Sequence, residues 1–209
     1  MGKENLFIMV SGPAACGKST LVTGLSKTLP AYVYKPSKSF IELALKRNIS
    51  IDRAFYDISR DDAEDHFCKK CIEKKVIVGD QHLSIQHYKD SLIASGNPIT
   101  EFPDEPYVSA IDYDIFKKLH ENEIRTLLIY LKASPEILYE RAYRRFFEQG
   151  IYIRNKNIKD VIEEVNAEDY YFNELISKIN IESYIINTDE KESKEVLEDA
   201  LQKTLKFRR

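Results

Sequence analysis

Residues 11–20 are Ser-Gly-Pro-Ala-Ala-Cys-Gly-Lys-Ser-Thr, and they match the phosphate-loop pattern Gly-x-x-x-x-Gly-Lys-[Ser/Thr]. An apolar run at residues 6–10 precedes the loop and indicates a buried strand. Residues 19–29 follow it, with apolar side chains at helical spacing: Leu21, Val22, Leu25 and Leu29. A glycine-rich turn between a strand and a helix directs backbone N–H groups and the positive end of the helix at one point. The stretch therefore predicts a binding loop for nucleotide phosphates.

The motif also assigns roles to individual residues. Lys18 is expected to be a catalytic residue that reaches the β- and γ-phosphates, and the Ser19 hydroxyl is expected to bind Mg²⁺. The expected cofactors are thus ATP and Mg²⁺. The residues expected to bind the nucleotide are Gly12, Pro13, Ala14, Ala15, Cys16, Gly17, Lys18, Ser19 and Thr20.

The rest of the chain alternates strand-like and helix-like patterns. Further strands are expected at residues 31–34, 76–78, 126–131 and 183–187. Helices are expected at 39–47, 53–74 with a break near Ser59, 82–94, 108–122, 135–148, 158–179 and 190–205, the last capped by Thr188 or Asp189. This alternation predicts a three-layer α/β/α fold of the P-loop NTPase type, with a five-stranded parallel sheet in a single domain at residues 1–209.

Composition restricts the class of protein. The 209 residues carry a formal net charge of −3, and 31% of them are charged with both signs mixed, which argues against a general nucleic-acid binder. No apolar run reaches transmembrane length, and the beginning of the chain does not resemble a secretory signal. Three cysteines form no disulfide pattern, and the pair Cys68 and Cys71 is best explained by packing on a helix. We therefore expect a cytoplasmic protein whose partners include neither nucleic acid nor a membrane.

An acid follows the predicted strand at residues 76–78. Ligands of open α/β sheets bind beyond the carboxyl ends of the strands, where Asp80 is placed. We expect Asp80 to be a catalytic residue that holds Mg²⁺ together with Ser19. The alternative is that Asp80 caps a following helix.

Several weaker patterns accompany the phosphate loop: the segment Asp80-Gln81-His82-Leu83-Ser84, Arg60 placed 20 residues before Asp80, and the late Asn187-Thr188-Asp189. With these features the chain resembles the thymidylate-kinase branch of the P-loop nucleoside and nucleotide kinases over nearly its whole length. The resemblance implies phosphoryl transfer from ATP to a nucleoside monophosphate, and it suggests a homodimer. It also implies that Lys35, Arg60 and Gln81 line the acceptor pocket.

Two positions depart from the pattern of that family. Lys35 stands where those enzymes have the glutamate of Glu-Pro-Gly, and Gln81 stands where they have an arginine that pairs with the acceptor phosphate. A neutral amide cannot make the charge-assisted bidentate contact of a guanidinium. We hypothesise that Lys35 and Arg60 together supply the missing positive charge. The alternative is that both are solvated or salt-bridged surface charges.

A basic helix face lies in the segment where such kinases carry a closing lid, here at about 141–157. Arg141, Arg144 and Arg145 share one face of the predicted helix, because they are spaced i, i+3 and i+4. We expect Arg141 and Arg145 to be catalytic residues that stabilise the charge on the transferred phosphoryl group. The alternative is an exposed face that pairs with Glu140 or Glu148.

Two other functions remain open on the sequence. The first is a P-loop phosphotransferase that acts on a nucleoside or on a non-nucleotide hydroxyl metabolite. Lys35 and Gln81 are the reasons to keep the non-nucleotide acceptor, whereas Lys35 disfavours a nucleoside kinase that uses a glutamate base at this position. The second is a nucleotide-binding regulatory protein without an acceptor, which the lid arginines disfavour.

Overall fold

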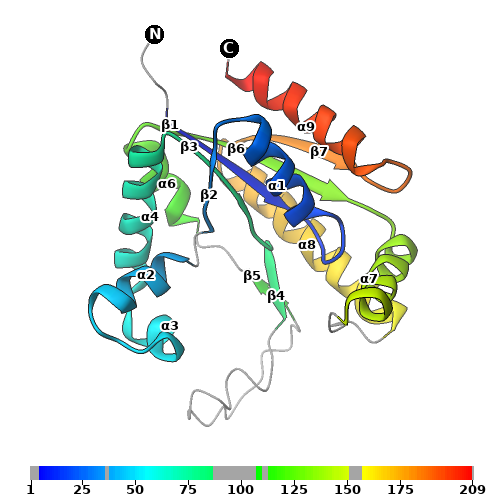
Figure 1. Cartoon of the computed structure of the whole chain (residues 1–209), viewed down its shortest axis with the longest axis horizontal. Coiled ribbons are helices and arrows are strands. Elements are labelled where there is room, and N and C mark those ends of the chain that lie inside the picture. Colours follow the sequence, from blue (N-terminus) through cyan, green and yellow to red (C-terminus); the bar gives the residue numbers. More distant parts are fainter. Residues whose placement is uncertain (1–4, 36–37, 87–106, 110–112, 151–156, 209) are drawn as a thin grey trace.

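The computed structural model describes residues 5–35, 38–86, 107–109, 113–150 and 157–208 (Figure 1). Its strands are β1 (Asn5–Ser11), β2 (Tyr32–Val33), β3 (Val76–Asp80), β4 (Ser84–Gln86), β5 (Tyr107–Ser109), β6 (Ile124–Lys132) and β7 (Glu182–Asn187). Its helices are α1 (Lys18–Thr28), α2 (Lys38–Lys46), the 3₁₀ turn η1 (Ile51–Arg53), α3 (Ala54–Asp57), α4 (Arg60–Lys74), α6 (Asp114–Glu121), α7 (Pro135–Gln149), α8 (Ile158–Lys178) and α9 (Ser193–Phe207).

Five strands form one parallel sheet in the order β2-β3-β1-β6-β7. The central strand β1 pairs with β3 and β6, so that Val10 lies opposite both Asp80 and Ile129. This register brings the carboxyl ends of β1, β3 and β6 together at one edge. The predicted five-stranded parallel sheet is confirmed, and this edge is where ligands of such sheets bind.

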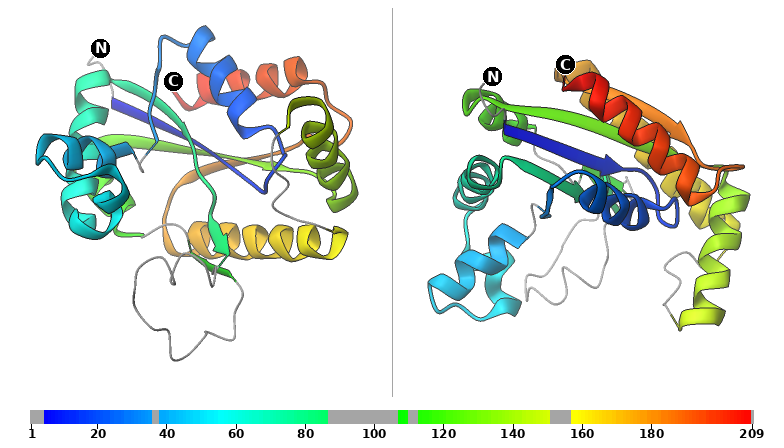
Figure 2. Two further views of the ribbon diagram at one scale, coloured as in Figure 1. Left: turned by 60° about the horizontal axis from the view of Figure 1, so that its bottom comes forward. Right: turned by 45° about the horizontal axis from the view of Figure 1, so that its top comes forward.

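Helices cover both faces of the sheet, because successive side chains of β1 point to opposite sides. Leu6, Ile8 and Val10 pack against α1 and α9 in one hydrophobic cluster. Phe7 and Met9 pack against α4, α6 and α8 in a second cluster. In the left view of Figure 2, α1 and α9 lie above the sheet and α8 lies below it. The predicted three-layer arrangement is confirmed.

The helix boundaries follow from their capping residues. The Ser59 side chain accepts a hydrogen bond from the Asp62 N–H at the start of α4, which confirms the predicted break near Ser59. The expected cap of the last helix is wrong, because α9 begins at Ser193 and Glu192 forms a capping box with Glu195. Asp189 instead accepts a hydrogen bond from the Ser134 N–H. No helix within the described ranges is both long and apolar enough to span a membrane.

The segment after β3 differs from the prediction. Residues 84–86 form β4, which pairs antiparallel with β5 at residues 107–109, where we expected the helices 82–94 and 108–122. The second of these helices is shorter and begins at Asp114. Residues 87–94 lie outside the described part of the chain. Pairing between strands about 20 residues apart leaves no local periodicity, which explains why the sequence pattern did not indicate it.

Candidate active site

The phosphate loop connects β1 to α1. Gly12, Ala15 and Gly17 have positive φ angles of 132°, 62° and 101°, so the backbone turns sharply before the first turn of α1. A left-handed conformation at the non-glycine Ala15 costs free energy and is typical of functional sites. Gly12 also packs against the neighbouring strand, because a Cβ atom there would lie 2.2 Å from the Leu131 carbonyl oxygen. The backbone of the loop is therefore fixed by β6.

Lys18 is the first residue of α1, and its side chain turns back into the loop. Its Nζ donates hydrogen bonds to the carbonyl oxygens of Gly12 at 2.5 Å and Pro13 at 2.7 Å, and only 8% of the residue is exposed. The ammonium group is thus held inside the loop that the sequence assigned to phosphate binding. A buried cation in that place favours an anionic ligand.

Ser19 and Asp80 meet at the carboxyl edge of the sheet. The Ser19 hydroxyl donates to Asp80 Oδ2 at 3.0 Å, and Lys35 Nζ lies 2.6 Å from Asp80 Oδ1. Burial alone would raise the pKa of Asp80, but the hydrogen bonds from Lys35 and Ser19 outweigh it and lower the pKa. Asp80 is thus ionised at neutral pH. The chain continues from Asp80 into β4 rather than a helix, so the helix-cap alternative is wrong.

The oxygens of Ser19 and Asp80 suit a magnesium ion. Mg²⁺ is bound by few protein oxygens together with substrate phosphates, and here a hydroxyl and a carboxylate lie side by side next to the phosphate loop. In the part of the chain that the structure describes, no group of three or more His, Cys, Asp or Glu side chains could hold a metal. A magnesium ion that shares its ligands with ATP does not require such a group.

The ion pair of Lys35 with Asp80 predicts a pH-dependent contribution to stability. Asp80 has a lowered pKa in the folded protein, so the contribution is present above its ordinary pKa of about 3.9 and is lost as the pH falls through the folded value. Lys35 is about half exposed, so we expect Lys35→Ala to lower the free energy of unfolding by at most about 1 kcal/mol at pH 7. Urea unfolding at a series of pH values from 7 downward measures this loss, which should shrink as the pH falls below about 4. A loss that stays constant with pH, or an equal loss in the exposed control Lys69→Ala, would contradict it.

A cavity of about 570 Å³ lies next to the phosphate loop. Its size is within the range of small-ligand sites. Arg141 belongs to the lining of this cavity, and its guanidinium donates to the Thr188 hydroxyl at 3.0 Å and to the Thr188 carbonyl. The lining residues are Ala15, Cys16, Gly17, Thr20, Leu21, Arg141, Arg145, Thr188, Lys191, Glu192, Ser193, Lys194 and Val196. The cavity is thus continuous with the loop and carries two of the predicted lid arginines.

The three arginines of α7 have different surroundings. Arg145 lines the cavity, whereas Arg144 is exposed and pairs with Glu140 at 2.6 Å. The alternative of an exposed, paired face thus describes Arg144.

We expect Arg145→Ala to raise the Kd for ATP about tenfold, because a charge-assisted hydrogen bond contributes about 1.5–3 kcal/mol. Calorimetric titration with ATP measures this, and Arg144→Ala is the control that should change Kd less than twofold. Equal effects of both substitutions would contradict a nucleotide-binding role of this cavity.

Two of the predicted acceptor residues, Lys35 and Gln81, follow β2 and β3 at the carboxyl edge of the sheet. Gln81 follows Asp80 directly, and its backbone N–H donates to the Val10 carbonyl at 3.0 Å while its carbonyl accepts from Ser11. Arg60 is the exposed first residue of α4, and the helix runs from there to the beginning of β3 (Figure 1). Lys35 is bound to Asp80, as described above. Residues 151–156 of the predicted lid lie outside the described part of the chain.

Sequence reasoning missed a buried polar group next to the loop. Glu164 and Glu168 of α8 are buried, and Glu164 Oε1 accepts a hydrogen bond from the Ala14 N–H at 2.7 Å. Glu168 Oε1 lies 3.2 Å from His82 Nδ1. A signal was present, because both glutamates fall in the apolar stripe of α8 together with Val161 and Val165.

The cysteines are packing residues, as the sequence indicated for Cys68 and Cys71. Both side chains lie in the cluster beneath the sheet, and burial raises the pKa of the Cys68 thiol to about 11. Burial also raises the pKa of the Cys16 thiol in the phosphate loop, more than the nearby Lys18 lowers it. A raised pKa keeps these thiols protonated and unreactive.

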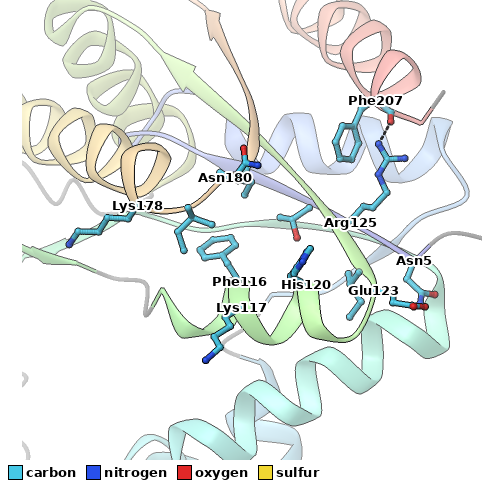
Figure 3. Close-up of a pocket in the computed structure, with 13 residues that line it drawn as sticks. Asn5, Phe116, Lys117, His120, Glu123, Arg125, Lys178, Asn180 and Phe207 are labelled. Carbon is cyan, nitrogen blue, oxygen red and sulfur yellow. Dashed lines mark hydrogen bonds between the residues drawn. The ribbon is translucent and has the colours of Figure 1, made fainter.

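A larger hollow of about 1190 Å³ lies elsewhere, at the amino ends of β1 and β6 (Figure 3). Asn5 and Ile124, the first residues of these strands, belong to its lining. Arg125 donates there to the Phe207 carbonyl, which ties β6 to the end of α9. Parallel sheets bind ligands at the carboxyl ends of their strands, so the smaller cavity at the loop is the better candidate.

Comparison with known proteins identifies the fold. No protein-family model and no curated protein sequence matches the chain. The structure is similar to that of the Deinococcus radiodurans tunicamycin resistance protein, with 16% identity, a TM-score of 0.56 and coverage of 96% of each chain. It is also similar to a deoxyadenosine kinase from M. mycoides with bound dATP, with 16% identity, a TM-score of 0.53 and coverage of 95% of this chain and 98% of that chain. A shikimate kinase from Acinetobacter baumannii in complex with shikimate matches with 16% identity, a TM-score of 0.50 and coverage of 96% and 93%.

Identities at this level show the fold alone, and they do not single out the thymidylate-kinase branch. The sheet order, the loop between β1 and α1, and these three similarities agree with one another. The chain has the α/β fold of the P-loop kinases.

Proposed function

We propose that this protein is an ATP- and Mg²⁺-dependent kinase of a small molecule. The observation that carries the proposal is the group formed by Lys18, Ser19 and Asp80, which places a cation, a hydroxyl and a carboxylate around one phosphate loop. The neighbouring cavity with Arg141 and Arg145 supports it, because a nucleotide bound to the loop needs space for its remainder. The fold shared with two proteins named as kinases gives further support.

In this proposal the roles follow from the chemistry of phosphoryl transfer. The backbone N–H groups of residues 15–20 and the Lys18 ammonium bind the phosphates and stabilise the charge on the transferred group. Ser19 and Asp80 hold Mg²⁺, which neutralises phosphate charge when it is bound. Lys35 keeps Asp80 ionised and oriented. Arg141 and Arg145 shape the nucleotide cavity, and Arg145 contacts the nucleotide.

Two classes of acceptor follow from the sequence. The resemblance to thymidylate kinases favours a nucleoside monophosphate held by Lys35, Arg60 and Gln81. The departures at Lys35 and Gln81 favour an uncharged hydroxyl compound. The ion pair of Lys35 with Asp80 supports this second class of acceptor, because the Lys35 ammonium already has a carboxylate partner. Both classes involve the same direct transfer without a covalent enzyme intermediate.

The proposal is tested by coupled measurement of ADP release with ATP and Mg²⁺. The panel of acceptors consists of nucleosides, their monophosphates, polyols and amino alcohols. We expect turnover with at least one acceptor and none without Mg²⁺. Tight ATP binding with no acceptor-dependent ADP release would contradict a kinase and would favour a nucleotide-binding regulator.

A further inference from the structure

Two carboxylates are buried on the face of α8 that packs against the sheet. Glu164 is 4% exposed and Glu168 is 0% exposed, and they lie four residues apart in a stripe otherwise made of apolar side chains. Burying a carboxylate is costly unless it is hydrogen-bonded. Packing of α8 alone would be served by two apolar residues, so the two carboxylates need another explanation.

The contacts of Glu168 fix the segment that follows Asp80. Its Oε1 lies 3.2 Å from His82 Nδ1, and its Oε2 accepts from the Leu83 N–H at 3.1 Å. These bonds attach α8 to the chain just beyond the carboxyl end of β3. Glu168 therefore holds in place the segment at His82 and Leu83, which follows Asp80.

Glu164 lies closer to the phosphate loop. Its Oε1 accepts from the Ala14 N–H at 2.7 Å and lies 4.0 Å from His82 Nδ1. Ala14 does not belong to the lining of the nucleotide cavity, which begins at Ala15, and neither do Glu164 and His82. Glu164 thus contacts the loop at a residue that is not part of the cavity lining. If the nucleotide occupies the cavity and the loop, an acceptor that attacks in line with the leaving group must approach from another side.

A buried carboxylate next to the loop restricts which acceptors can bind. A phosphate-bearing acceptor would bring a further negative charge next to Glu164 and Glu168 in a site with low solvent access, and like charges repel strongly there. A neutral hydroxyl compound meets no such repulsion, because its O–H donates a hydrogen bond to a carboxylate oxygen.

Resting on the kinase function proposed above, we propose that Glu164 is the general base that activates the acceptor, and that the acceptor is an uncharged or cationic hydroxyl compound rather than a nucleoside monophosphate. In this step the acceptor hydroxyl gives its proton to the Glu164 carboxylate. Its oxygen forms a bond to the γ-phosphorus of ATP, and the bond from that phosphorus to the β–γ bridging oxygen breaks. ADP leaves with the electron pair, and the proton passes from Glu164 to water.

The acceptor class is tested first on the wild-type enzyme with matched pairs, each nucleoside against its own 5′-monophosphate, together with polyols and amino alcohols. We expect ADP release with members of the uncharged or cationic class, and at least tenfold lower kcat/KM with each monophosphate than with its nucleoside. Turnover with monophosphates alone would overturn this inference and leave the kinase function intact. No turnover with any acceptor would overturn the kinase function itself.

The role of Glu164 is tested with Glu164→Gln, which keeps the size of the side chain and an oxygen for the Ala14 N–H. General-base catalysis contributes about 10²–10⁴ in rate, so kcat for the best acceptor should fall at least 100-fold. The Kd for ATP should not rise, because the substitution removes a negative charge beside the phosphate loop. The control is Glu163→Gln, because Glu163 is the exposed neighbour on the same helix, and it should leave both values unchanged.

Two results would overturn the base assignment. One is a kcat within threefold of wild type for Glu164→Gln. The other is much tighter ATP binding with unchanged kcat, which would mean that Glu164 only competes with the nucleotide for the Ala14 N–H. If Glu164→Gln does not fold, Glu164→Asp is measured instead: a shortened carboxylate should retain part of kcat at unchanged Kd for ATP. Full activity of Glu164→Asp would contradict a positioned base.

Discussion

Lys18→Ala is expected to lower kcat/KM about 10³-fold, because removal of one preorganised charge from a transition state costs about 10²–10³ in rate and Lys18 also binds the ground-state phosphates. The Lys18 ammonium lies inside the loop, bonded to two of its carbonyl oxygens. The substitution therefore removes the cation and leaves these carbonyl oxygens without their donor. Activity with the best acceptor and calorimetric titration with ATP measure the two effects.

A control separates this loss from a general effect of removing a lysine from α1. Lys27 is an exposed residue in the last turn of the same helix, and Lys27→Ala should leave kcat/KM within twofold of wild type. The thermal unfolding of both variants should be measured alongside. A Lys18→Ala enzyme that stays folded and keeps more than a tenth of its activity would show that the loop is not the catalytic centre.

Gly12→Ala is expected to destabilise the protein and abolish ATP binding. A Cβ atom at residue 12 would lie 2.2 Å from the Leu131 carbonyl oxygen, and the φ angle of 132° is one that an L-residue rarely adopts. Backbone strain of this kind costs about 1–3 kcal/mol, and forced overpacking adds a similar amount. For a chain of this length a loss of about 3 kcal/mol lowers Tm by roughly 6–12 °C. Scanning calorimetry measures the shift, and titration with ATP measures binding.

Two other glycines provide matched controls. Gly17 has a φ angle of 101°, but among the described residues other than its chain neighbours nothing lies within 4 Å of a Cβ atom at this position. Gly17→Ala thus isolates the strain and should cost about half as much. The three atoms nearest to a Cβ at Gly24 in α1 belong to the flexible side chain of Leu197, so Gly24→Ala should be close to neutral. Equal losses for Gly12→Ala and Gly17→Ala would contradict the importance of the contact with β6.

Local features of the fold could be predicted from the sequence. The phosphate loop is specified by consecutive residues, and the buried strands appear as apolar runs such as residues 6–10 and 126–131. The pair of β4 and β5 could not be predicted, because its partners are separated by about 20 residues and neither strand has a distinctive pattern. The cap of α9 was misplaced because Asp189, a good capping residue by type, is bound to Ser134 at the end of β6.

In the candidate site too, some residues could be predicted from local sequence, whereas others depend on contacts between distant parts of the chain. Ser19 was predicted from the phosphate-loop motif, and Asp80 from its place at the carboxyl edge of the sheet. The contact of Lys35 with Asp80 depends on β2 lying next to β3, and strand order is not encoded in local sequence. The place of Glu164 in the apolar stripe of α8 distinguishes it from the exposed Glu163, but its contact with the phosphate loop depends on tertiary packing.

The most direct test of the central claim is ³¹P NMR of the wild-type enzyme with ATP, Mg²⁺ and the acceptor that the panel identifies. The account predicts a new phosphate-ester resonance that grows in step with ADP, while inorganic phosphate stays at the level of the sample without enzyme. ADP that forms together with inorganic phosphate alone would contradict transfer to an acceptor. ATP resonances that broaden on binding but do not diminish would contradict catalysis altogether.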